Sequence, residues 1–113
     1  TDMLNPLCGW SWKTDDYWTA AKRILTAERV FNVREGISAK DDRLPKRMYA
    51  EKLPAGPKKG VVFTEEDQKQ RQADAYKFLG WDDKGIPTEA TLKAYSLEFL
   101  IDDLNAARKK YNL

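Results

Sequence analysis

Four pairs of adjacent aspartates are the first candidates for chemistry in this sequence. Paired carboxylates serve acid–base catalysis when both groups face one substrate, but neighbours on a helix point about 100° apart. Helix starts and turns account for the first three pairs, and a solvated helix face accounts for the fourth. We therefore predict no catalytic role for the pairs, which are Asp15-Asp16, Asp41-Asp42, Asp82-Asp83 and Asp102-Asp103.

The supply of reactive side chains is small, with no histidine and one cysteine, Cys8, among 113 residues. This excludes a histidine base, a Ser–His–Asp triad, a zinc finger and an iron–sulfur cluster held by this chain's own thiolates. Without a disulfide partner, Cys8 predicts a reducing, cytoplasmic location, and its place between Leu7 and Gly9 favours a small buried hydrophobe. The composition argues against a self-contained enzyme.

Length and charge predict one soluble domain over residues 1–113. Twenty basic and 18 acidic side chains give a net charge of +2, and no apolar run reaches the length needed to cross a membrane. Four tryptophans and five tyrosines leave nucleic-acid binding as a minor alternative, because aromatic rings stack on bases. Their positions on helix stripes and in turns favour packing instead, so we expect no nucleic-acid partner and no membrane.

The elements that must position the polar residues are helices. A long helix is predicted to open at Thr14 and to end at Gly36, which can adopt the left-handed conformation of a helix terminator. Apolar side chains recur along it every three or four residues, and we expect this stripe to face the core. The stripe comprises Tyr17, Trp18, Ala21, Ile24, Leu25 and Phe31.

Four shorter helices are predicted after the long one. One begins near Pro45, one is capped by Thr64 together with Asp67, one is capped by Thr88, and Ser96 is a candidate cap for the last. Val61-Val62-Phe63 is strand-like but too short to build a sheet. The fold class predicted is all-α, a compact bundle of about four to five helices with long loops and no sheet.

Two charged runs stand close together in the sequence, at residues 28–36 and 41–47. Arginine pairs with carboxylates through two parallel hydrogen bonds, so the runs can form an ion-pair network that fixes the loop over residues 37–45 to the end of the long helix. An ordinary solvated surface is the alternative. The network is predicted to pair Arg29, Arg34 or Arg47 with Glu28, Glu35, Asp41 or Asp42.

At these residues the sequence resembles the C-terminal region of tungsten-dependent aldehyde:ferredoxin oxidoreductases. Three more segments agree with that family in order: Gly9 to Trp12, Leu53 to Gly60 and Gly80 to Thr88. We predict a structural role for the residues that carry the resemblance. They are Glu28, Arg29, Asn32, Arg34, Glu35, Gly36, Asp41, Asp42, Pro45, Arg47, Gly80, Trp81, Gly85 and Pro87.

The resemblance implies a parent enzyme that oxidises aldehydes to carboxylic acids. It implies a tungsten bis-pterin cofactor, a four-iron, four-sulfur cluster and ferredoxin as the electron acceptor. The family's cluster motif is absent from this chain, and Cys8 is out of register with the family's remaining cluster cysteine. No catalytic residue, cofactor ligand or metal ligand of the family therefore maps onto this sequence.

The resulting prediction is a helical C-terminal domain with an architectural role, inactive alone, whose partner is the remainder of the parent polypeptide. A domain that belongs to a larger body should expose an apolar patch, and we expect it around Trp10 and Trp12. The alternative is a free-standing helical interaction module, for which a uniformly polar surface is expected.

Overall fold

A computed structural model describes all 113 residues, and every regular element in it is helical. The only β-type pairing is an isolated bridge between Trp81 and Pro87, which confirms the all-α class. Val61-Val62-Phe63 forms no strand. The elements are α1 (Leu4–Cys8), α2 (Thr14–Arg34), α3 (Lys46–Ala50), α4 (Glu65–Leu79), α5 (Glu89–Ala94), the 3-10 helix η1 (Glu98–Leu100) and α6 (Ile101–Tyr111).

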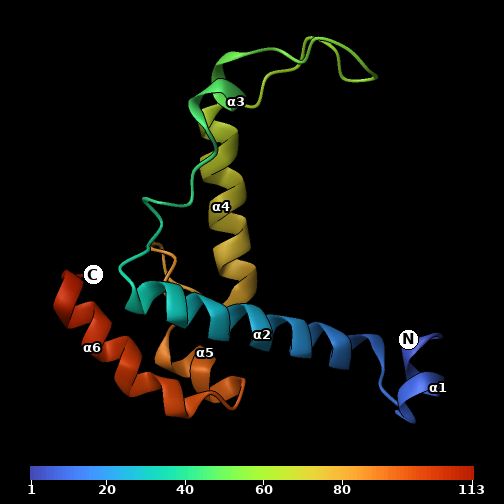
Figure 1. Ribbon diagram of the computed structural model, residues 1–113, viewed down its shortest axis with the longest axis vertical. Helices are drawn as coiled ribbons and strands as arrows, with labels where there is room; N and C mark the ends of the chain where they lie inside the picture. Colours follow the sequence, from blue (N-terminus) through green and yellow to red (C-terminus); the bar gives the residue numbers. More distant parts are fainter.

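The helices are arranged around α2, which crosses the molecule (Figure 1). Helices α5 and α6 lie along its C-terminal half, α4 projects away from it, and α3 with the following loop sits at the far end of α4. The N-terminal end of α2 extends beyond the other helices and carries α1 at its tip, while Trp18 of the same half still meets Phe78 of α4 edge-on. The arrangement is flatter and more open than the expected compact bundle, with principal extents of 45 × 45 × 19 Å.

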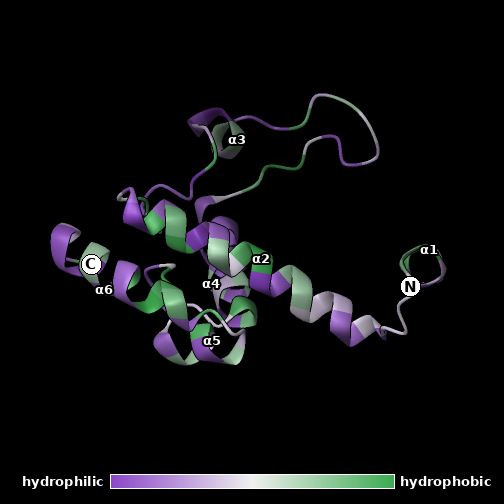
Figure 2. Cartoon of the chain, turned by 60° about the horizontal axis from the view of Figure 1, so that its bottom comes forward, coloured by the Kyte–Doolittle hydropathy of each residue, from purple (hydrophilic) through white to green (hydrophobic).

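A small core explains this openness. Only the C-terminal half of α2, the turn before α5, and α5 to α6 contribute fully buried apolar side chains. Figure 2 shows further apolar stretches in α1 and in the loop after α3, both remote from this core. The core consists of Val30, Val33, Ile86, Leu92, Leu97, Leu104 and Ala107.

Several helix boundaries follow the predicted capping signals. The Thr64 hydroxyl accepts a hydrogen bond from the Asp67 backbone N–H, and the Asp67 carboxylate accepts one from the Thr64 N–H, which completes a capping box at α4. Gly80 ends α4 in the left-handed conformation. Thr88 caps α5 by accepting from the Thr91 N–H. These local interactions confirm the predictions made for α4 and α5.

Other predictions about elements were wrong. Ser96 caps no helix: its own φ is +54°, and a 3-10 turn separates it from α6. Helix α1 was not predicted, because it is a single turn with no side-chain cap to announce it. Cys8 ends α1 and is exposed rather than buried, since this turn lies far from the core.

The apolar stripe of α2 also faces a different way from the prediction. The buried face of α2 is formed by Thr26, Arg29, Val30 and Val33. Most of the predicted stripe is exposed instead, namely Trp18, Ile24, Leu25 and Phe31. The periodicity located an apolar side of α2. The core of this chain packs against a different side of the helix, which periodicity alone does not reveal.

Candidate functional site

Arg29 forms the centre of the one extensive polar site in the core region. Its guanidinium donates from Nη1 and Nη2 to the two carboxylate oxygens of Asp42, at 2.8 and 2.5 Å. Its Nε donates to the backbone carbonyl of Gly85 at 2.7 Å. With 8% of its side chain exposed, Arg29 thus joins α2 to the loop before α3 and to the turn before α5.

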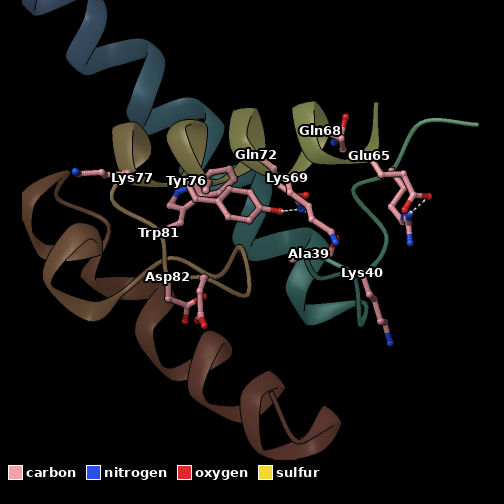
Figure 3. Close-up of a pocket in the computed structure, with 13 residues that line it drawn as sticks. Ala39, Lys40, Glu65, Gln68, Lys69, Gln72, Tyr76, Lys77, Trp81 and Asp82 are labelled. Atoms are coloured by element: carbon pink, nitrogen blue, oxygen red, sulfur yellow. Dashed lines mark hydrogen bonds and ion pairs between the residues drawn. The ribbon is translucent and has the colours of Figure 1, made fainter. Parts of the chain in front are cut away.

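Helix α4 completes the site from the other side (Figure 3). The Tyr76 hydroxyl donates to the Asp42 carboxylate. The Gln72 amide donates to the Tyr76 hydroxyl at 2.7 Å and to the backbone carbonyl of Ala39 at 3.1 Å. The Asp42 carboxylate therefore receives hydrogen bonds from α2 and α4 together.

An aromatic wall closes the site. The Trp81 ring centre lies 5.3 Å from the Arg29 guanidinium carbon and 5.8 Å from the Tyr76 ring centre. A guanidinium next to an indole face gains cation–π attraction. The indole N–H donates to the Thr26 hydroxyl at 3.3 Å. We call Arg29, Asp42, Tyr76, Trp81 and Gly85 the arginine cluster.

Charge pairing governs the pKa values in the arginine cluster. Burial alone would raise the pKa of Asp42, but the hydrogen bonds from Arg29 and Tyr76 and the positive charge of Arg29 lower it overall. Burial alone would lower the pKa of Arg29. The hydrogen bond to Asp42 and the negative charge of Asp42 outweigh burial, so the pKa of Arg29 is raised overall. The pKa of Tyr76 is raised by burial and by its bond to Asp42. All three residues stay in the protonation states that pair best at neutral pH.

Gly85 allows the cluster to close. Its φ is +71°, and a Cβ built there would lie 2.6 Å from Arg29 Nη2 and 2.7 Å from the Tyr76 ring. A side chain at this position would therefore push against both partners of Asp42. The turn needs glycine for its backbone conformation and for the close approach of the arginine.

A second ion pair fixes the same turn to α6. Arg108 donates to Asp82 Oδ2 at 2.9 Å, while Asp82 Oδ1 accepts from the backbone N–H groups of Lys84 and Ile86 at 2.9 and 3.0 Å. One carboxylate thus shapes the turn from within and holds it to the last helix.

The structure brings together only part of the predicted network. Arg29 pairs with Asp42 as predicted, and this pair fixes the loop over residues 37–45. Asp41 accepts from the Ser38 N–H at 3.0 Å and shapes that loop without meeting an arginine. Arg47 was wrongly included: it pairs with Glu51 within exposed α3 at 2.7 Å. Helix α3 lies at the end of α4 that points away from α2 (Figure 1).

The remaining predicted residues have local roles. Arg34 pairs with neighbouring Glu35 at the exposed end of α2, and no partner of Glu28 is found. Asn32 offers its backbone carbonyl to the Ile37 N–H, and Gly36, with φ +93°, packs closely against Tyr111. The others lie at element boundaries. Pro45 precedes α3, Gly80 ends α4, and Pro87 bridges Trp81.

The roles of four residues were not predicted from the sequence: Gln72, Tyr76 as a hydrogen-bonding residue, and the paired Asp82 and Arg108. The expectation that aromatic residues on helix stripes serve packing holds for Tyr76, which is 8% exposed. The available signal was its hydroxyl, because a buried tyrosine usually needs a hydrogen-bond partner. Its partner, Asp42, is 34 residues away in the sequence.

The hydrogen bonds and ion pairs of this arrangement join α2, α4 and two loops. Every fully buried side-chain nitrogen and oxygen has a hydrogen-bond partner within the chain. A groove of about 610 Å³ lies over the cluster between α4 and the 39–43 loop (Figure 3). Its rim mixes lysines with acidic side chains and selects no single ligand charge.

A comparison with known protein families identifies the family of this chain. The family model for aldehyde ferredoxin oxidoreductase, domains 2 and 3, matches residues 1–97, a range that contains the whole arginine cluster. The chain belongs to the aldehyde ferredoxin oxidoreductase family. The resemblance noted from the charged runs is thereby confirmed.

Individual relatives agree with this membership. The chain is 43% identical over 99 residues to the tungsten-containing aldehyde ferredoxin oxidoreductase of Pyrococcus horikoshii, covering 87% of this chain and 16% of the relative. The Thermococcus kodakarensis protein of the same description is 43% identical over 101 residues, covering 88% and 16%. An aliphatic sulfonate oxidoreductase, WOR-like subunit, of Pyrococcus furiosus is 36% identical over 74 residues, covering 66% and 12%. The chain spans about one sixth of the length of the tungsten-containing relatives.

Side chains that commonly bind metals do not gather into a site in this chain. A four-iron cluster takes four protein ligands, most often thiolates, and this chain has one cysteine. No three histidine, cysteine, aspartate or glutamate side chains come together as a possible metal site.

No helix is both long enough and apolar enough to cross a membrane.

Proposed function

We propose that this chain is an architectural helical domain of an aldehyde ferredoxin oxidoreductase-like enzyme and carries out no catalysis alone. The observation that carries the proposal is the family match over residues 1–97 in a chain equivalent to 16% of its relatives' length. Residues 1–113 act as one unit whose arginine cluster keeps α2, α4 and two loops in a fixed relation.

In the proposed parent, the reaction is the oxidation of an aldehyde to a carboxylic acid in the cytoplasm. The tungsten bis-pterin would supply the redox chemistry, and a four-iron, four-sulfur cluster would pass electrons to ferredoxin. The residues that hold these groups are assigned to the rest of the parent polypeptide, which is the partner of this chain. The helices of this chain would pack against the part of the parent that holds the cofactors.

The surface of the chain supports this proposal over a free-standing module. Large apolar side chains are exposed around Trp10 and Trp12, as expected for a part of a larger body, and others follow along α2 and α3. A uniformly polar surface was the expectation for the free-standing module.

A graft tests the proposal. The matching segment of the Pyrococcus horikoshii relative is replaced by this chain, and tungsten content and aldehyde oxidation are measured on the purified graft. We expect both to be retained, and a relative lacking the segment should lose both. The isolated 113-residue chain should fold, bind no tungsten or iron and oxidise no aldehyde. Stoichiometric tungsten or iron in the isolated chain would contradict the proposal.

A further inference from the structure

Helix α2 has a second apolar face, opposite its buried one. Successive residues of a helix are about 100° apart, so Ile24 lies about 180° and Phe31 about 160° around the axis from buried Val33. Tyr17 falls on the same line, seven residues before Ile24. We call Tyr17, Ala20, Ile24 and Phe31 the reverse face of α2.

Most of the reverse face is not covered by this chain, although Tyr17 and Ala20 are half-buried and the Arg34 guanidinium carbon lies 4.8 Å from the Phe31 ring centre. Ile24 is 59% exposed and Phe31 is 55% exposed, and neither belongs to the core. A shallow hollow of about 410 Å³ lies at the start of the face, lined by Trp12, Ala20, Ile24 and polar neighbours. Amphipathic helices bury their apolar face against a partner, so an apolar face left uncovered within this chain indicates a partner outside it.

An aromatic group continues this face beyond the start of α2. The rings of Trp10 and Trp12 stack at 4.5 Å, and Trp12 meets Tyr17 edge-on at 5.1 Å. Asn5 holds the group in place, because its amide donates to the Trp12 carbonyl at 2.7 Å and accepts from the Tyr17 hydroxyl at 2.5 Å. The aromatic group is thus ordered without touching the core, as a preformed contact surface would be.

The total surface of the chain shows how much is uncovered. The chain exposes 8426 Å² of accessible surface. A compact monomer of this mass exposes about 6300 Å². The radius of gyration is 17.7 Å, whereas a compact domain of this length has a radius of about 13 Å. The excess of about 2000 Å² is spread over the whole extended chain, including the arm of α4 and α3, and it leaves room for more than the roughly 800 Å² per partner of a standard contact.

We propose that the reverse face of α2 and the aromatic group of Trp10, Trp12 and Tyr17 dock against the remainder of a full-length family member. This inference rests on the proposed function and names the surface through which it operates. The relatives supply the occupant, since about five sixths of their length lies outside the matched segment. In the assembled enzyme α2 is then an interior helix, covered on one side by α5 and α6 and on the other by the parent body.

Variants of the reverse face test the inference in the isolated chain and in the Pyrococcus horikoshii graft. Ile24→Glu with Phe31→Glu should leave the circular dichroism spectrum and Tm of the isolated chain unchanged within about 2 °C, because neither side chain packs in the core. In the graft the same pair should lower the yield of folded, tungsten-containing protein at least tenfold. Phe99→Glu is the matched control, since its ring is 71% exposed on η1, and it should preserve the yield.

Each outcome separates the inference from its alternatives. A double-variant graft that assembles as well as the wild-type graft overturns the docking surface and leaves the proposed function intact. A wild-type graft that fails to assemble counts against both. If analytical ultracentrifugation shows the isolated chain to be a stable dimer that Phe31→Glu dissociates, a second copy covers this face and the inference is wrong.

Discussion

The Arg29 guanidinium and the Asp42 carboxylate face each other in a two-point ion pair, with nitrogen–oxygen distances of 2.8 and 2.5 Å. The arginine comes from α2 and the aspartate from the loop between α2 and α3. Through Asp42, which also accepts from Tyr76, the pair ties this loop to both α2 and α4. Its strength is therefore the first property to test.

Removing the charge of Asp42 should strongly destabilise the chain. Asp42→Asn leaves the buried guanidinium without its counter-ion, and breaking such a pair from one side costs about 2–4 kcal/mol of unfolding free energy. Urea denaturation at pH 7 measures the loss. The control is Glu51→Gln, which breaks the exposed Arg47–Glu51 pair. Loss of an exposed pair of this kind should cost about 0.5 kcal/mol or less. Equal effects of the two variants would show that the Arg29–Asp42 pair is not energetically distinct.

The same carboxylate should make stability depend on acid. The folded state holds the pKa of Asp42 below its ordinary value. Because the unfolded value is about 3.9, Asp42 stabilises the fold fully above that pH, and the stabilisation is lost as the pH falls through the lower folded pKa. The difference in unfolding free energy between wild type and Asp42→Asn should thus be constant from about pH 5 to 7 and shrink below about pH 4. A difference that does not change down to about pH 2 would contradict this linkage.

The hydroxyl of Tyr76 should contribute independently of its ring. Tyr76→Phe keeps the ring against Trp81 but removes one donor to Asp42 and leaves the Gln72 amide without one of its acceptors. We expect a loss of about 1–2 kcal/mol in urea denaturation. Tyr49→Phe, which removes an exposed hydroxyl that only accepts from the Leu44 N–H, should cost less. The reverse order would remove Tyr76 from the cluster.

Alanine substitutions at Gly56 and Gly85 distinguish the cost of backbone strain from the cost of a steric clash. Gly56 and Gly85 both have positive φ. Replacing either by alanine therefore costs about 1–2 kcal/mol in backbone strain. Only at Gly85 would the new Cβ also meet Arg29 and Tyr76, whereas nothing lies within 4 Å at Gly56. Gly85→Ala should therefore destabilise the chain by a further amount of about 1 kcal/mol or more. Comparable losses in thermal or urea unfolding would mean that the turn relaxes away from the cluster.

Local signals predicted much of the helical framework. The Thr64–Asp67 capping box, the Gly80 terminator and the Thr88 cap lie within a few residues of the backbone groups that they satisfy. Such interactions need no distant partner, so their residue types and spacing are enough to predict them. The pairing of Arg29 with Asp42 could also be predicted, because the two residues lie on either side of one short connection.

Long-range choices were less predictable. Tyr76 meets Asp42 across 34 residues, and Arg108 meets Asp82 across 26, so neither pair leaves a local pattern. The exposure of Cys8 depends on where α1 lies relative to the core. Arg47 illustrates the converse. It lies close to Asp42 in the sequence, but α3 lies at the far end of α4 from α2, and there Arg47 pairs with Glu51.

By itself, the sequence determined the all-α class, most helix boundaries, the family and the shortage of cofactor ligands, because residue types and short spacings encode these properties directly. Only the tertiary structure decided which side of α2 enters the core. Thr26 and Arg29 are polar, yet they are buried because the Trp81 indole and the Asp42 carboxylate satisfy them. Ile24 and Phe31 are apolar, yet they remain outside because hydrophobicity specifies burial without specifying the partner.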